Sequence, residues 1–140
     1  MTQKAEDNMK IETLEEIREV FKKDRFATEN GMVVDELGED YAVCSMETTE
    51  HHLNAADTVM GGVYFTLADF AFAVLANHLH AVTVTLNSDI TFLSSAKKGS
   101  RLIARAECVR SGKTTTCCRV EIRDNEGRLC TISTSNGFKL

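Results

Sequence analysis

The chain has 140 residues, of which 43% are apolar and 26% charged, and its net charge is −5. This length supports one domain with one hydrophobic core, and the composition excludes disordered, collagen-like and disulfide-dense proteins. An acidic net charge does not favour a nucleic-acid partner, because affinity for phosphate depends on a basic surplus. We therefore expect a single domain over residues 1–140 and no nucleic-acid binding.

The charge is unevenly distributed along the chain. Residues 1–80 hold 6 Lys and Arg against 16 Asp and Glu, whereas residues 81–140 hold 10 against 5. Such an asymmetry indicates either a site for an anionic small ligand or solvated surface charge without a partner.

The cysteines predict a reducing compartment. Their number is odd, and no signal peptide precedes them, so we expect free thiols and a cytoplasmic protein. The sequence has no Cys-x-x-Cys pair, so a metal site is not expected. The five residues are Cys44, Cys108, Cys117, Cys118 and Cys130.

The first third of the chain predicts one helix and two strands. Residues 1–10 are polar and are expected to be flexible. The run Thr13-Leu14-Glu15-Glu16 has the form of a capping box, and apolar residues then recur at helical spacing, which predicts a helix over 13–24. Strands over 32–37 and 41–46 should follow, ahead of a polar stretch without regular structure.

The segment 61–76 is apolar on every face of a helix, and Asp69 is its only charge. It is shorter than the roughly 20 residues that a membrane span needs, so we expect no membrane association. Helices that are apolar all round lie inside a core. The segment therefore predicts a buried central helix.

The remainder of the chain predicts four strands, over 82–93, 102–110, 114–123 and 129–138. Short turns between the last three imply antiparallel pairing. The element order gives an α+β fold in which an antiparallel sheet curls around a central helix.

Asp69 is the first candidate for chemistry. A carboxylate inside an apolar helix is costly to bury unless it is hydrogen-bonded or its pKa is raised. A fold tolerates that cost either for a structural hydrogen-bond network or for a functional site. From periodicity alone both readings stay open, and in the second Asp69 is a general base or a nucleophile.

The pair Gly61-Gly62 opens the same helix. First-turn amides lack intrahelical partners and lie at the positive end of the helix dipole, and glycine lets a ligand oxygen approach them. Such an amide can stabilise an oxyanion, although the pair also fits a plain loop-to-helix junction. Because about two turns separate Gly61 from Asp69, both can border one crevice.

The loop before this helix holds His51, His52 and Asn54. Adjacent histidines cannot easily bind one metal ion, so both are interpreted as solvated loop residues. An asparagine there either orients a carbonyl or water, or forms a turn.

These residues together resemble the signature of hot-dog-fold thioesterases, in the PaaI-like branch named after phenylacetic acid degradation. The resemblance rests on Asn54 ahead of Gly61-Gly62, followed by Leu67-Ala68-Asp69 on the helix, and on the strand containing Ile90-Thr91-Phe92-Leu93. It covers about residues 33–138 and implies a hot-dog fold, with a sheet wrapped around a long helix.

The resemblance also implies a function: metal-free hydrolysis of an acyl-CoA thioester to CoA and a carboxylic acid, with no added cofactor. Asp69 would be the base or nucleophile, the Gly61 amide would polarise the carbonyl, and Asn54 would orient the water or the carbonyl. Thr85 matches a hydroxyl position that helps to place the water. Members are homodimers that often pair into homotetramers, with active sites at the dimer interface.

Three further residues are expected at the substrate. Gly62 follows the oxyanion donor, Lys113 is a candidate for the CoA phosphates, and Met60 stands where the family usually has His. Since backbone amides do not need that ring, we expect an altered rate or specificity rather than total loss.

Met60 also favours the alternative of a non-catalytic acyl-CoA binding or sensing protein. A hot-dog hydratase is disfavoured, because Ala73 and Val74 stand where it would need a histidine near the acid.

Overall fold

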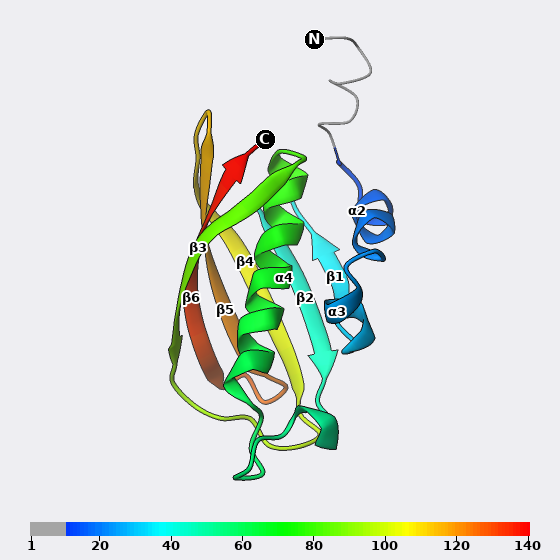
Figure 1. The fold of residues 1–140 in the computed structure, drawn as a ribbon, viewed down its shortest axis with the longest axis vertical. Helices are drawn as coiled ribbons and strands as arrows, with labels where there is room; N and C mark the ends of the chain where they lie inside the picture. Colours follow the sequence, from blue (N-terminus) through cyan, green and yellow to red (C-terminus); the bar gives the residue numbers. More distant parts are fainter. Residues whose placement is uncertain (1–10) are drawn as a thin grey trace.

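The computed structural model of the chain describes residues 11–140, so the expected flexibility of residues 1–10 lies outside the described residues. Figure 1 shows one long helix lying across one face of a sheet. In chain order the elements are α2 (Leu14–Phe21), α3 (Arg25–Glu29), β1 (Val33–Leu37), β2 (Tyr41–Glu47), the 3₁₀ turn η1 (Glu50–His52), α4 (Gly61–Leu79), β3 (Thr83–Phe92), β4 (Arg101–Ser111), β5 (Thr115–Asp124) and β6 (Leu129–Lys139).

The six strands form one sheet in the order β1-β2-β4-β5-β6-β3, and all neighbours are antiparallel. The predicted α+β architecture is therefore confirmed. Strands β4, β5 and β6 form the expected meander, but β3 does not pair with β4, which follows it in the chain. It lies at the sheet edge beside β6 instead, so its other side is unpaired among residues 11–140 (Figure 1).

Helix α4 forms the centre of the core. It continues three residues beyond the predicted end, to Leu79, and nine of its residues are buried. Leu67, Phe72 and Leu75 lie in one core cluster with inward-facing side chains of β4 and β5. Burying each such side chain stabilises the fold by about 1.5–3 kcal/mol. The helix is long and apolar enough to cross a membrane by length and composition, but its packing against the sheet accounts for that composition.

The close approach of α4 to the sheet depends on Gly137 in β6. A Cβ added there would lie 2.7 Å from Thr83 Cγ2 and 3.0 Å from Phe72 Cζ, distances that real Cβ contacts rarely or never reach. Glycine removes that atom and lets the Phe72 ring pack directly on the strand backbone.

Helices α2 and α3 lie beside β1 and cover one flank of α4 (Figure 1). The predicted Thr13 cap is confirmed, because its side chain accepts a hydrogen bond from the Glu16 amide at 3.1 Å. The reciprocal half of the box differs, since the Glu16 carboxylate accepts from the Glu12 amide. Phe21 of α2 meets Phe70 of α4 edge to face at 5.7 Å, which joins the two helices.

The outer face of the sheet is charged. Its arginines pair with neighbouring carboxylates, as in Arg105–Glu107 at 2.7 Å and Arg119–Glu121 at 3.1 Å. Much of the basic surplus of the C-terminal half is therefore paired surface charge.

Candidate active site

Asp69 lies on α4 and is only partly exposed, facing the edge formed by β3 and β6. Thr85 Oγ1 of β3 donates a hydrogen bond to Asp69 Oδ1 at 3.1 Å. Burial raises the pKa of Asp69 above its usual value, the Thr85 hydrogen bond lowers it, and the charge of Asp24 raises it further. A half-buried carboxylate with a raised pKa is suited to accept a proton near neutral pH.

The surroundings of Asp69 favour a functional over a structural role. Within residues 11–140, the one side-chain hydrogen bond that the carboxylate accepts comes from Thr85, on Oδ1. A carboxylate held for structure alone normally accepts several. The second oxygen, Oδ2, is therefore available to a water molecule or a substrate.

Small hydroxyl side chains lie next to Asp69. These are Ser88, Ser133 and Ser135, which line a narrow crevice beside Asp69 together with Phe65, Ala68 and Ile90. Ser88 Oγ and Ser135 Oγ are 2.7 Å apart. The sequence interpretation missed them, although Thr131, Ser133 and Ser135 alternate in β6 with the period of one sheet face.

The first turn of α4 presents free backbone donors. Its N-cap is Met60, whose side chain makes no capping hydrogen bond. Within the described part of the chain, the amides of Gly61 and Gly62 donate to no backbone or side-chain acceptor, whereas that of Val63 donates to Met60 O. Free amides at the N-terminus of a 19-residue helix form a site for a negatively charged oxygen.

Exposed apolar side chains surround these amides. The ring of Phe92 lies beside Gly61, where an added Cβ would be 3.3 Å from two ring carbons. Met60, Phe65 and Phe92 are 54%, 40% and 53% exposed. Three large apolar groups around two free amides indicate a surface that a ligand or another protein chain covers.

Asn54 orders the loop before α4. Its Oδ1 accepts hydrogen bonds from the amides of Ala56 and Thr58, at 2.9 and 3.2 Å, and its Nδ2 donates to Thr58 Oγ1 at 3.0 Å. Asn54 is compatible with both predicted roles. Its side-chain oxygen Oδ1 forms a turn, while one Nδ2 hydrogen is left for a further partner.

The two adjacent histidines differ, which corrects their common interpretation as solvated residues. His51 is exposed, but His52 is 7% exposed. Its ring faces a cavity of about 50 Å³ between α3, β2 and the first turn of α4. The adjacency of His51 and His52 in the sequence does not indicate this difference, because His52 is buried by contact with α3, which the sequence did not predict.

The candidate residues fall into two groups within one chain. Asp69 and Thr85 form one, and Asn54, Met60, Gly61 and Gly62 form the other, at the start of α4. Eight residues of helix, or about 12 Å along the axis, separate Gly61 from Asp69.

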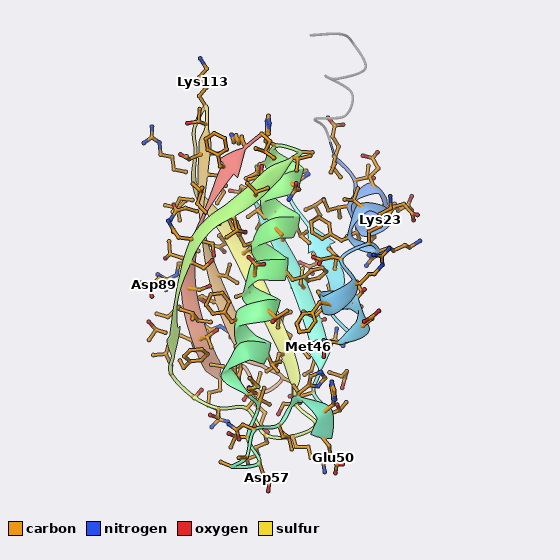
Figure 2. The ribbon with its side chains drawn as sticks, viewed as in Figure 1. Lys23, Met46, Glu50, Asp57, Asp89 and Lys113 are labelled. Atoms are coloured by element: carbon orange, nitrogen blue, oxygen red, sulfur yellow. The ribbon has the colours of Figure 1, made fainter. Side chains whose placement is uncertain are left out.

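Lys113 belongs to neither group. Figure 2 shows it at the tip of the β4–β5 hairpin, at the end of the molecule opposite Asp57 and Glu50, which mark the loop before α4. One protomer alone therefore does not bring Lys113 to Gly61. Among residues 11–140, no cluster of three or more His, Cys, Asp or Glu is arranged to hold a metal ion.

Comparison with known proteins identifies the family. Residues 56–131 match the model of the thioesterase superfamily. The acyl-coenzyme A thioesterase PaaI of Escherichia coli is 32% identical over 103 residues, which are 74% of each protein. The solved structure of E. coli PaaI, from the phenylacetic acid degradation operon, has a TM-score of 0.85 at 26% identity and covers 91% of this chain and 96% of its own.

Two further proteins extend this similarity. Human acyl-coenzyme A thioesterase 13 is 33% identical over 82 residues, 57% of this chain and 59% of that protein. A Streptococcus pneumoniae thioesterase solved with coenzyme A has a TM-score of 0.79 at 28% identity, covering 84% of this chain and 94% of its own. The chain therefore belongs to the thioesterase superfamily, as a PaaI-like thioester hydrolase with the hot-dog fold.

Proposed function

We propose that this chain hydrolyses acyl-CoA thioesters with Asp69 as general base or nucleophile and the Gly61 amide as oxyanion donor. The observation that carries the proposal is the half-buried Asp69 carboxylate, which accepts a hydrogen bond from Thr85 on a helix that begins with Gly61 and Gly62. Among residues 11–140, the second oxygen of Asp69 and the amides of these two glycines have no hydrogen-bond partner. Similarity to a thioesterase solved with coenzyme A supports the substrate class.

The chemistry follows from these groups. In the general-base form, Asp69 takes a proton from water, and the water oxygen adds to the thioester carbonyl. The resulting oxyanion receives the Gly61 N–H, the C–S bond then breaks, and the CoA thiolate leaves with the proton. In the nucleophilic form, the carboxylate attacks the same carbon, the C–S bond breaks and the CoA thiolate leaves; water then cleaves the mixed anhydride to the carboxylic acid and restores Asp69. Neither form uses an added cofactor or a metal ion.

The separation of Gly61 from Asp69 points to a site shared by two subunits. A base must lie within a hydrogen bond, or one water, of the reacting atoms. The roughly 12 Å between the two residues on one helix exceeds that reach. We therefore pair Asp69 of one subunit with the Gly61 amide and Asn54 of its partner.

The β3 edge supplies the surface for this dimer. An unpaired strand of ten residues readily pairs with another chain. Three of the large apolar side chains on and before β3 are exposed by 41–56%, namely Val82, Val84 and Leu86. Antiparallel pairing of two β3 edges covers these side chains. It also makes α4 of the partner subunit run in the opposite direction, so that the first turn of that helix lies at the Lys113 end of this subunit. There Lys113 can meet the CoA phosphates. Further pairing of dimers into a homotetramer remains an expectation from the family.

Subunit mixing tests the shared site. A heterodimer of Asp69→Asn and Gly61→Pro chains has one site with both intact groups and one site with neither, so it should show about half the activity of the wild-type dimer. Each homodimer of the variants should be inactive by comparison. Co-expression with two different tags isolates the heterodimer for a thiol-release assay. A heterodimer as inactive as its parents would place the whole site in one chain.

Replacing Thr85 tests its effect on the pKa of the Asp69 carboxyl group. Since the Thr85 hydrogen bond lowers the pKa of Asp69, Thr85→Val should raise that pKa. Activity needs ionised Asp69 and is lost as the pH falls through its pKa, so the acid limb of kcat/KM should move to higher pH. Thr85→Ser retains the hydroxyl donor and should keep the wild-type profile. Coincident profiles for valine and wild type would contradict the role of Thr85.

A binding protein without catalysis is the second candidate, favoured by Met60 at the helix N-cap, where the family usually has His. Tight acyl-CoA binding with no turnover would select it. In either case we propose a cytoplasmic location, supported by the five free cysteines.

A further inference from the structure

His52 is a buried histidine that the proposed chemistry does not use. It closes the turn η1, immediately before the loop that leads into α4. Its ring lies between three parts of the chain: the turn itself, helix α3 through Asn30, and the first turn of α4 across the cavity that Val63 and Thr66 also line.

Both ring nitrogens of His52 have partners. The Thr49 amide donates to Nδ1 at 3.0 Å, so Nδ1 carries no proton. The proton of the neutral ring is then on Nε2, which donates to Asn30 Oδ1 at 3.2 Å. The Asn30 amide is itself oriented, because its Nδ2 donates to Phe26 O at 2.8 Å. The contacts therefore define one tautomer, which is uncharged.

The backbone of His52 continues this connection to α4. Its carbonyl accepts a hydrogen bond from the Met60 amide at 2.9 Å, and Leu53 and Val59 form an isolated antiparallel bridge beside it. Met60 directly precedes Gly61 and has no side-chain cap of its own. The position of the first amides of α4 thus depends on the segment that the His52 ring attaches to α3.

We propose that His52 is a positioning residue of the thioesterase site, whose neutral ring fixes the loop to α3 and thereby holds the Gly61 and Gly62 amides in place for the thioester carbonyl. The role of the amides rests on the proposed function. The hydrogen-bond connection from α3 through His52 to Met60 is independent of it.

Protonation of the ring would disrupt this arrangement. A proton on Nδ1 removes the acceptor for the Thr49 amide and leaves Thr49 Oγ1, 3.2 Å away, as the one partner of that nitrogen, whereas the Nε2 contact to Asn30 is unaffected. No side chain lining the cavity beside His52 is a carboxylate that could stabilise the cation: besides Asn30 they are Phe26, Met32, Met46, Gly62, Val63 and Thr66. Burial lowers the pKa of His52, and the neighbouring charge of His51 lowers it further. Glu50, on the same turn, is paired with Lys98 at 2.6 Å.

The direction of the pH effect on activity follows from these contacts. As the pH falls through the lowered pKa of His52, its ring gains a proton and the loop loosens. Asp69 also loses its charge on the acid side. Protonation of His52 then adds a finite loss of kcat to the loss that protonation of Asp69 causes, so the acid limb of log kcat in the wild type should show a step in addition to the slope of one that Asp69 gives.

The test replaces His52 by asparagine and uses His51→Asn as the matched control. Asparagine Oδ1 occupies the place of Nδ1 and keeps the Thr49 acceptor, but it does not titrate. We expect His52→Asn to lower kcat by about two- to tenfold at neutral pH, through the lost Asn30 contact, and to remove the additional step from the acid limb, leaving the slope of one. His51→Asn should match the wild type in kcat at neutral pH and should keep the additional step, moved to higher pH because the charge of His51 no longer lowers the pKa of His52.

Hydrogen exchange of residues 49–62 gives a readout that does not need activity. After correction for the intrinsic pH dependence, exchange in the wild type should accelerate as the pH falls from neutrality through the pKa of His52, and in His52→Asn it should not change over the same range. If no acyl-CoA is hydrolysed at all, the proposed function fails and exchange alone decides the role of His52. Acid limbs of the same shape in the wild type and His52→Asn, or exchange that responds alike in both proteins, would overturn the proposal.

Discussion

The Asp69→Asn protein is expected to lose thioester hydrolysis by about 10²–10⁴-fold while it still folds and binds acyl-CoA. Asparagine has nearly the same size, and its Oδ1 can still accept the hydrogen bond from Thr85, so the local geometry should persist. It cannot take a proton or attack a carbonyl at neutral pH. The substitution therefore removes the base or nucleophile and leaves the geometry of the site unchanged.

The measurement is a thiol-release assay with acetyl-, hexanoyl-, palmitoyl-, phenylacetyl- and hydroxybenzoyl-CoA, run beside a direct binding assay. Asp40→Asn provides the matched control, because Asp40 is an exposed carboxylate in the turn between β1 and β2. It should retain wild-type turnover. Hydrolysis by Asp69→Asn at the wild-type rate would exclude Asp69 from the mechanism, whereas binding without turnover in the wild type would favour the acyl-CoA binding protein.

The sequence predicted the elements whose own residues determine them. Helix α4 was evident because it is apolar on every face, and Asp69 was evident because it is the one charge there. The strands of the C-terminal half were found within a few residues, because their turns contain Gly112 and Gly127 between β-branched runs.

What the sequence did not predict depends on contacts between distant segments. Helix α3 has only five residues, too few for a hydrophobic period, and it exists because it packs against α4. The place of β3 at the sheet edge follows from its pairing with β6, which no local pattern specifies.

The residues of the candidate site likewise divide into features that the sequence predicted and features that depend on contacts between distant segments. Asn54, Gly61 and Asp69 were recognised by their spacing, which also gives the roughly 12 Å between Gly61 and Asp69, but spacing could not show that Thr85 of β3 donates a hydrogen bond to Asp69. Neither could it show that His52 is buried and His51 exposed, since the two differ only in which side of the turn faces α3.

The Gly61→Pro protein is expected to lose about 10²–10³-fold in kcat, because proline has no N–H to donate to the oxyanion. Position 61 is the first residue of α4, where proline is well tolerated, and the residue before it already has the extended conformation that proline requires, with φ −63° and ψ 140° at Met60. The fold should therefore survive a substitution that removes a single hydrogen-bond donor.

The Gly61→Ala protein separates the amide from the space that glycine leaves. It keeps the N–H, and its Cβ would lie 3.3 Å from the Phe92 ring, which is 53% exposed and can move by the few tenths of an ångström required. Alanine should therefore retain activity within about tenfold of the wild type, well above proline. Equal losses in the two variants would mean that contact with Phe92, rather than the amide, limits turnover. Wild-type kcat in a folded proline variant would exclude Gly61 as the donor and would direct attention to the amide of Gly62.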